Sequence, residues 1–77
     1  MTKEQLKKIL ESSLENCSTT VESDDNVHFS ATIIADEFNG MKSKVKRQQL
    51  VYSKVNEYIL SGELHAFSMK TIATNEL

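Results

Sequence analysis

The sequence predicts a single α+β domain over residues 1–77, a two-layer sandwich in the order helix, strand, strand, helix, strand. Two stretches carry apolar residues at the three- and four-residue spacing of an amphipathic helix, and three show the two-residue alternation of a half-buried strand. A short polar turn between the first two strands predicts an antiparallel hairpin. The second helix supplies a right-handed crossover that lays the last strand parallel to one hairpin strand. We therefore expect a three-stranded mixed sheet with both helices on one face.

The first helix is expected to begin after Thr2 and to run for about three turns. Thr2 and Gln5 have the spacing of a capping box, in which the hydroxyl and the amide each satisfy a free backbone donor. Apolar residues then recur at helical spacing while the lysines and glutamates between them face away. These apolar positions are Leu6, Ile9, Leu10 and Leu14.

The two hairpin strands are expected on either side of the polar turn SDDN, residues 23–26. The first strand, CSTTVES, alternates with Cys17, Thr19 and Val21 on one side. The second strand, VHFSATIIA, is expected to place His28 on the open side. Its core side would carry Phe29, Ala31 and Ile33.

Phe38 is expected to anchor the following loop, which contains Gly40, against the core. The second helix is then expected over residues 43–60, with Ser43 as its N-cap and Gly62 just past its end. Its core stripe is predicted from Val51, Val55, Tyr58 and Ile59, with Gln48 and Tyr52 at the rim.

The last strand is expected over residues 64–72, with His65, Phe67 and Met69 on one face and the latter two in the core. The final residues, TNEL, begin at most one more helical turn.

Composition favours a binding or adaptor protein over an enzyme. Seventy-seven residues with three Phe and two Tyr offer little material to enclose a substrate and exclude water. A single cysteine excludes an internal disulfide, as is typical of a reducing compartment. The sequence shows neither a secretory signal pattern nor an apolar run of the roughly 18 residues that a membrane span needs. We therefore expect a cytoplasmic protein without membrane contact.

A basic run precedes and opens the second helix. It consists of Lys42, Lys44, Lys46 and Arg47, and no acidic residue occurs in residues 38–56. One interpretation is a solvated helix face. The other is an anion-binding surface for nucleic acid or an acidic protein partner, for which four phosphate contacts would give a salt slope of about −3.6.

The two histidines and the cysteine are the candidate metal ligands. His65 opens the last strand, where it is either a half-buried histidine bonded to a backbone carbonyl or an exposed ligand. A structural zinc site needs four ligands, and Cys17, His28 and His65 have no close ligand spacing. No motif supports a catalytic pair of Cys17 with a histidine. A metal bound by His65 would therefore take its remaining ligands from another protein.

The segments EFNG, VKRQQLVY and HAFSMKT together resemble the BolA-like proteins, and VKRQQLVY most resembles their acid-stress branch. The resemblance runs from about Val27 to Thr71. It implies a class II KH-like fold, in agreement with the element order above. At the GXXG position of KH domains this chain has Gly40-Met41-Lys42-Ser43, which lacks the second glycine.

The resemblance also implies a function, that of an iron–sulfur adaptor in cluster trafficking or in iron and stress regulation. The implied partner is a cytosolic monothiol glutaredoxin, and the implied cofactor is a [2Fe-2S] cluster shared with glutaredoxin and glutathione, present only in the complex. The implied ligand is His65, with His28 and Cys17 both open as the second. The alternative is a DNA-binding regulator that uses the basic run. Alone, the chain is expected to be a monomer or a weak homodimer.

Overall fold

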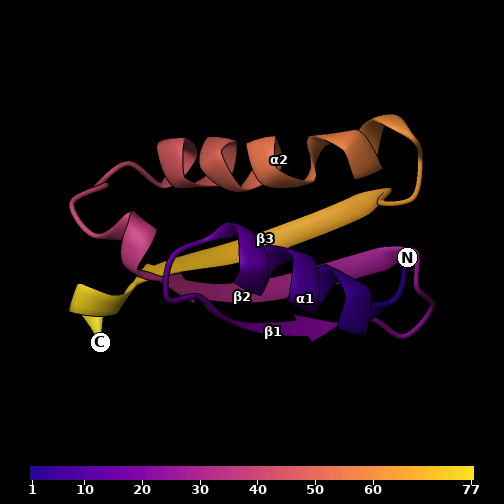
Figure 1. Cartoon of the computed structure of the whole chain (residues 1–77). Coiled ribbons are helices and arrows are strands. Elements are labelled where there is room, and N and C mark those ends of the chain that lie inside the picture. Colours follow the sequence, from indigo (N-terminus) through magenta and orange to yellow (C-terminus); the bar gives the residue numbers. More distant parts are fainter.

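The computed structural model describes residues 1–77 and contains two helices packed on one face of a three-stranded sheet (Figure 1). Two single turns of 3-10 helix, η1 and η2, follow β2 and β3. The predicted element order is confirmed. The bounds are α1 Lys3–Ser13, β1 Ser18–Glu22, β2 His28–Ala35, η1 Asp36–Phe38, α2 Lys44–Leu60, β3 Ala66–Ala73 and η2 Thr74–Glu76.

The sheet has the order β1-β2-β3, with β2 in the centre. β1 and β2 are antiparallel, and Thr19 lies opposite Ile33. β3 runs parallel to β2, with Phe67 beside Phe29. The mixed sheet is thus confirmed. The sequence left open which hairpin strand receives the crossover, and the structure assigns it to β2.

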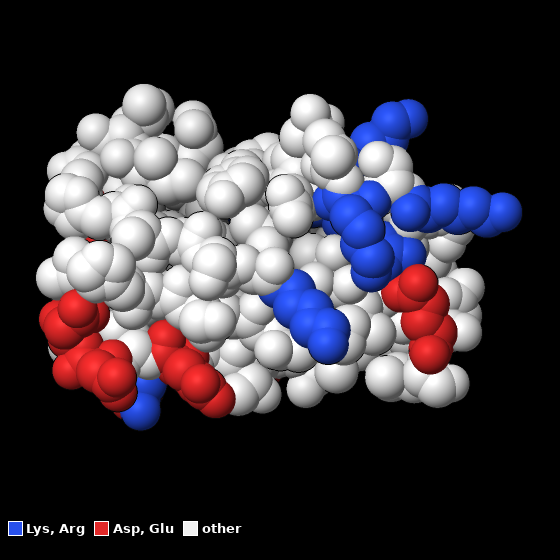
Figure 2. Space-filling model, turned by 180° about the vertical axis from the view of Figure 1, so that it is seen from behind, with Lys and Arg blue, Asp and Glu red and all other residues white.

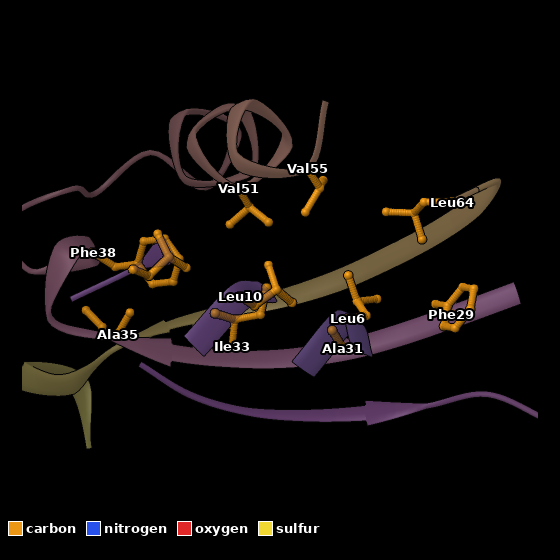
Figure 3. Packing of buried hydrophobic residues seen from close by; sticks show 12 residues of the cluster. Leu6, Leu10, Phe29, Ala31, Ile33, Ala35, Phe38, Val51, Val55 and Leu64 are labelled. Atoms are coloured by element: carbon orange, nitrogen blue, oxygen red, sulfur yellow. The ribbon is translucent and has the colours of Figure 1, made fainter. Parts of the chain in front are cut away.

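The core lies between the helices and the sheet, as Figure 3 shows. Each helix contributes residues of its predicted stripe, and β2 contributes alternate residues along its whole length. Phe38 is fully buried, which confirms that it anchors the loop after β2. Twelve residues form the buried cluster: Leu6, Leu10, Leu14, Phe29, Ala31, Ile33, Ala35, Phe38, Val51, Val55, Leu64 and Ala73.

The ends of both helices follow the predicted local chemistry. Thr2 and Gln5 form the capping box, with the Thr2 amide donating to Gln5 Oε1 at 2.8 Å and the Gln5 amide donating to Thr2 Oγ1 at 3.2 Å. Ser43 caps α2 by accepting from the Lys46 amide at 3.3 Å. Gly62 has φ +82° after the end of α2, a left-handed conformation that glycine adopts without strain.

Side chains of α1 cover part of the outer edge of β1. The Thr19 amide donates to Glu11 Oε2 at 2.9 Å, and Lys7 Nζ donates to the Thr19 carbonyl. The hydrogen bond from Thr19, followed by that from Lys7, lowers the pKa of Glu11 below its usual value. Satisfying these backbone groups internally leaves them unavailable to another strand.

The predicted stripe of α2 needs correction. Arg47 lies on its inner face with Val51 and Val55 and is 3% exposed, whereas Ile59, predicted in the stripe, is 36% exposed. Tyr52, predicted at the rim of the stripe, is 40% exposed, in agreement with that position.

The sequence predicted Phe67 and Met69 as core residues. In the structure both are only half-buried and pack against the rim of the core. Because β3 is an edge strand, the neighbouring helix covers only part of its inner face. Tyr52 packs edge-on against Phe67 with ring centroids 6.1 Å apart and donates its hydroxyl to the Phe67 carbonyl at 3.3 Å. The inner face of β3 is fully buried only further along, at Thr71 and Ala73.

Candidate functional site

His65 lies in the tight connection between α2 and β3. Its neighbour Leu64 is 1% exposed and donates its amide to the Tyr58 carbonyl at 3.0 Å, while the Ala66 amide donates to the Val27 carbonyl at 3.4 Å. His65 itself is exposed, and its ring lies beside Gly62, where an added Cβ would stand 3.8 Å from Cε1. The backbone on both sides is therefore fixed while the imidazole reaches solvent, which contradicts a half-buried histidine bonded to a carbonyl.

His28 begins β2 and is held by the turn before it. Asp25 Oδ2 lies 2.8 Å from His28 Nδ1, and Asp25 Oδ1 accepts from the amides of Val27 and His28, each at 2.9 Å. The hydrogen bond from the His28 ring, followed by the two amides, lowers the pKa of Asp25 well below its usual range. Because Nδ1 faces the carboxylate, Nε2 is the ring nitrogen left for a ligand role.

The two histidines lie at the same end of the sheet, one at the start of β2 and the other just before β3. His28 is in register with Ala66, so these two side chains share the open face. His65 precedes β3, and its ring lies beside Gly62 at the end of α2. The only histidine ring held by a protein hydrogen bond is that of His28. The fold therefore leaves the ring of His65 free.

Cys17 lies at the opposite end of the sheet. Its neighbour Ser18 pairs with Ile34, six residues along β2 from His28, which corresponds to about 20 Å. Its Sγ is 3.1 Å from Thr19 Oγ1, and partial burial raises the pKa of the thiol. Cys17 therefore does not share a metal ion with either histidine of the same chain.

No group of three or more His, Cys, Asp or Glu side chains is arranged to hold a metal ion within the chain. His65 is therefore not part of such a group within one chain.

The basic run divides into exposed and buried members. Lys42 and Lys46 are exposed, and Lys44 donates Nζ to the Thr71 carbonyl at 3.0 Å. Arg47, predicted as part of the binding surface, is buried. It belongs to the fold because its guanidinium satisfies backbone and side-chain acceptors inside the molecule.

Arg47 joins four segments. Its Nε donates to the Met41 carbonyl at 2.6 Å, and its Nη1 donates to the Thr71 carbonyl at 3.3 Å and to Glu76 Oε1 at 2.8 Å. Its guanidinium carbon also lies 5.8 Å from the centre of the Phe38 ring. Sequence reasoning missed Glu76, since a partner 29 positions away leaves no local signal.

Glu76 gives this cluster a pH dependence. Hydrogen bonds from Arg47, and then from the Ala73 amide, lower the pKa of Glu76 from 4.5 to about 2. A carboxylate with a depressed pKa stabilises the folded state above its unfolded pKa, and that contribution is lost as the pH falls from about 4.5 towards 2.

We therefore expect Glu76→Gln to lose less stability than the wild-type chain between pH 6 and pH 3, measured by urea unfolding. Glu22→Gln, at an exposed carboxylate without a hydrogen bond, is the control, and equal losses in all three proteins would contradict this role.

The basic run and His65 lie at opposite ends of α2. This helix has 17 residues, so its two ends are about 25 Å apart. Figure 2 shows most of the blue side chains towards one end of the molecule and a group of acidic side chains at the other. A partner docked on His65 must therefore extend along the whole of α2 to contact the lysines.

None of the helices has the length and apolar character that a membrane span requires.

Comparisons with known proteins agree in pointing to one family. The family model described as BolA-like protein matches residues 2–76. The acid stress protein IbaG of Escherichia coli is 41% identical over 54 residues, which cover 70% of this chain and 63% of IbaG. An uncharacterized protein from the rpoN-murA intergenic region of Acinetobacter guillouiae is 37% identical over 76 residues, 99% of this chain and 89% of that protein. The solved structure of a BolA homologue from Coxiella burnetii superposes with a TM-score of 0.85 at 28% identity, covering 99% of this chain and 95% of the other.

Proposed function

Because the chain belongs to the BolA-like protein family, we propose that it acts as an adaptor that binds a bridging [2Fe-2S] cluster together with a monothiol glutaredoxin. In this proposal the glutaredoxin and glutathione supply thiolates, and His65 supplies one imidazole. The complex would carry clusters or report on iron and stress in the cytoplasm. No catalytic group of this chain takes part.

The observation that carries the proposal is the free imidazole of His65 at the rigid junction of α2 and β3. It is exposed, and no group of three or more metal-binding side chains surrounds it. An exposed histidine outside any such group fits a cluster shared between two proteins better than a metal site within one chain.

Imidazole ligation would set the properties of the shared cluster. Replacing a thiolate by a neutral histidine raises the reduction potential, as in Rieske centres. Because only the deprotonated nitrogen binds iron, ligation also weakens when the histidine is protonated. Among the two candidate second ligands, His28 lies at the same end of the sheet as His65, whereas Cys17 lies at the other end.

The test is a titration of cluster-loaded monothiol glutaredoxin with this protein, followed by visible circular dichroism. We expect the wild-type chain to change the visible circular dichroism spectrum of the cluster. His65→Ala should leave that spectrum unchanged, because the iron then has no imidazole ligand. Cys17→Ser should behave as wild type, and His28→Ala reports whether Nε2 of His28 is the second ligand. An identical spectral change with wild type and His65→Ala would remove the ligand assignment.

A second candidate function is binding of DNA by the basic end, favoured by the exposure of Lys42 and Lys46 beside Lys44. With Arg47 buried, three lysines remain, and three phosphate contacts predict a salt slope of about −2.7, or a loss of about 40-fold between 50 and 200 mM salt. Fluorescence anisotropy with labelled duplex DNA measures this slope. The double variant Lys42→Ala with Lys46→Ala should reduce the magnitude of the salt slope by about 2, since each phosphate contact contributes about 0.9. Unchanged affinity in this double variant would exclude the basic end as the DNA site.

A further inference from the structure

The outer edge of β3 carries backbone groups that no other strand engages. β3 lies at one edge of the sheet and pairs with β2 alone. The Ala66 amide donates to the Val27 carbonyl, so Ala66 and every second residue after it direct their backbone groups towards β2. The alternate residues direct theirs away from the sheet, and these are Phe67, Met69, Thr71 and Ala73. Such a row of outward groups is a template on which a further strand can pair.

Side chains of α2 bind two carbonyls of this row. The Tyr52 hydroxyl donates to the Phe67 carbonyl at 3.3 Å. Lys44 Nζ and Arg47 Nη1 both donate to the Thr71 carbonyl, at 3.0 Å and 3.3 Å, which uses both lone pairs of that oxygen. We call these three hydrogen bonds the edge contacts. They occupy the acceptors that an added strand would use on either side of Met69.

Met69 lies between the edge contacts and is not reached by them. The row ends at Ala73, whose amide donates to Glu76 Oε1 of the C-terminal turn at 2.7 Å. The side-chain hydrogen bonds to the row therefore go to Phe67, Thr71 and Ala73, in agreement with the alternation along the strand. Residues 67–71 thus form a strand edge that is covered at both ends and open at its centre.

We propose that the β3 edge is a surface for pairing with a second copy of this chain and that the edge contacts prevent this pairing. In an antiparallel pair centred on Met69, the two Met69 residues exchange both backbone hydrogen bonds, and Phe67 of each copy pairs with Thr71 of the other. The acceptors in these outer pairs are the carbonyls that the edge contacts occupy. While the contacts are intact only the central pair can form, and it does not offset the entropy lost on association.

The side chains around Met69 suit a second copy as the occupant. In the same arrangement Lys70 of one copy lies opposite Ser68 of the other, so no two lysines face each other directly. The half-buried Met69 side chains lie opposite each other, and their contact removes apolar surface from water. Pairing a strand with its own copy about a central residue is twofold symmetric, and such closed dimers are the commonest homo-oligomers.

Tyr52→Ala combined with Lys44→Ala tests the edge contacts, with Ser53→Ala combined with Lys54→Ala as the matched control. All four residues are exposed on α2, so both proteins should fold. Sedimentation equilibrium gives the dissociation constant of the dimer. We expect this constant to fall at least about tenfold in the first variant, since an acceptor is freed at each end of the edge and is used twice in a twofold dimer. The control should behave as wild type, and equal constants in all three proteins would reject the inference.

Amide hydrogen exchange locates the contact. In the first variant the amides of Met69 and Thr71 should exchange more slowly as the protein concentration rises, because each gains an acceptor from the second copy. The Val21 amide lies on the outer edge of β1, two residues from the Thr19 amide that Glu11 binds, and should exchange at an unchanged rate. Slower exchange at Val21 and not at Met69 would assign the association to β1 and overturn the inference. A dimer with unchanged exchange at both edges would reject pairing through a strand.

Discussion

Replacing Arg47 with methionine is expected to destabilise the fold by about 3 kcal/mol, because hydrogen bonds from charged groups contribute about 1.5–3 kcal/mol each. The guanidinium is buried, and its removal takes the donor from the Met41 carbonyl and releases Glu76. The Thr71 carbonyl keeps a second donor in Lys44, which limits the loss. Glu76 is partly exposed and can be hydrated once Arg47 is gone, so releasing it costs less than leaving the Met41 carbonyl without a donor.

Urea unfolding followed by far-ultraviolet circular dichroism measures this loss. Lys46→Met is the control, since Lys46 is an exposed neighbour on the same turn, and changes at such positions usually stay within about 0.5 kcal/mol. If both variants unfold at the same urea concentration, Arg47 does not hold the loop, the strand edge and the C-terminal turn together.

Phe38→Ala is expected to cost about 3–5 kcal/mol, the usual range for removing a buried aromatic ring. Phe38 is 0% exposed and closes the core beneath the loop that leads to α2. A domain of this size rarely has more than about 3–5 kcal/mol of net stability, so the variant should be largely unfolded at 25 °C.

Tyr52→Ala provides the comparison for Phe38. Tyr52 is 40% exposed and makes an edge-on contact with Phe67, and such aromatic pairs contribute about 0.5–1.5 kcal/mol. This variant should therefore remain folded, with a modest shift of its urea midpoint. A Phe38→Ala protein as stable as Tyr52→Ala would contradict the place of Phe38 in the core.

The candidate site was only partly readable from the sequence. His65 was singled out by its position at the start of a strand and by the family resemblance, but its exposure required the structure. The bond between His28 and Asp25 had a local signal, an aspartate three residues earlier in a turn.

By itself the sequence determined the helices, the strands and the inward faces of α1 and of the strands. Capping at Thr2 and Ser43 and the spacing of apolar residues act over a few positions, so they are legible without the fold. The tertiary structure alone decided how deeply each face is buried and which distant side chains meet. It buried Arg47 against Glu76, left Phe67 half-covered on an edge strand, and separated the basic run from His65 by the length of α2. Periodicity gives the direction of a side chain, but its depth depends on which elements pack over it.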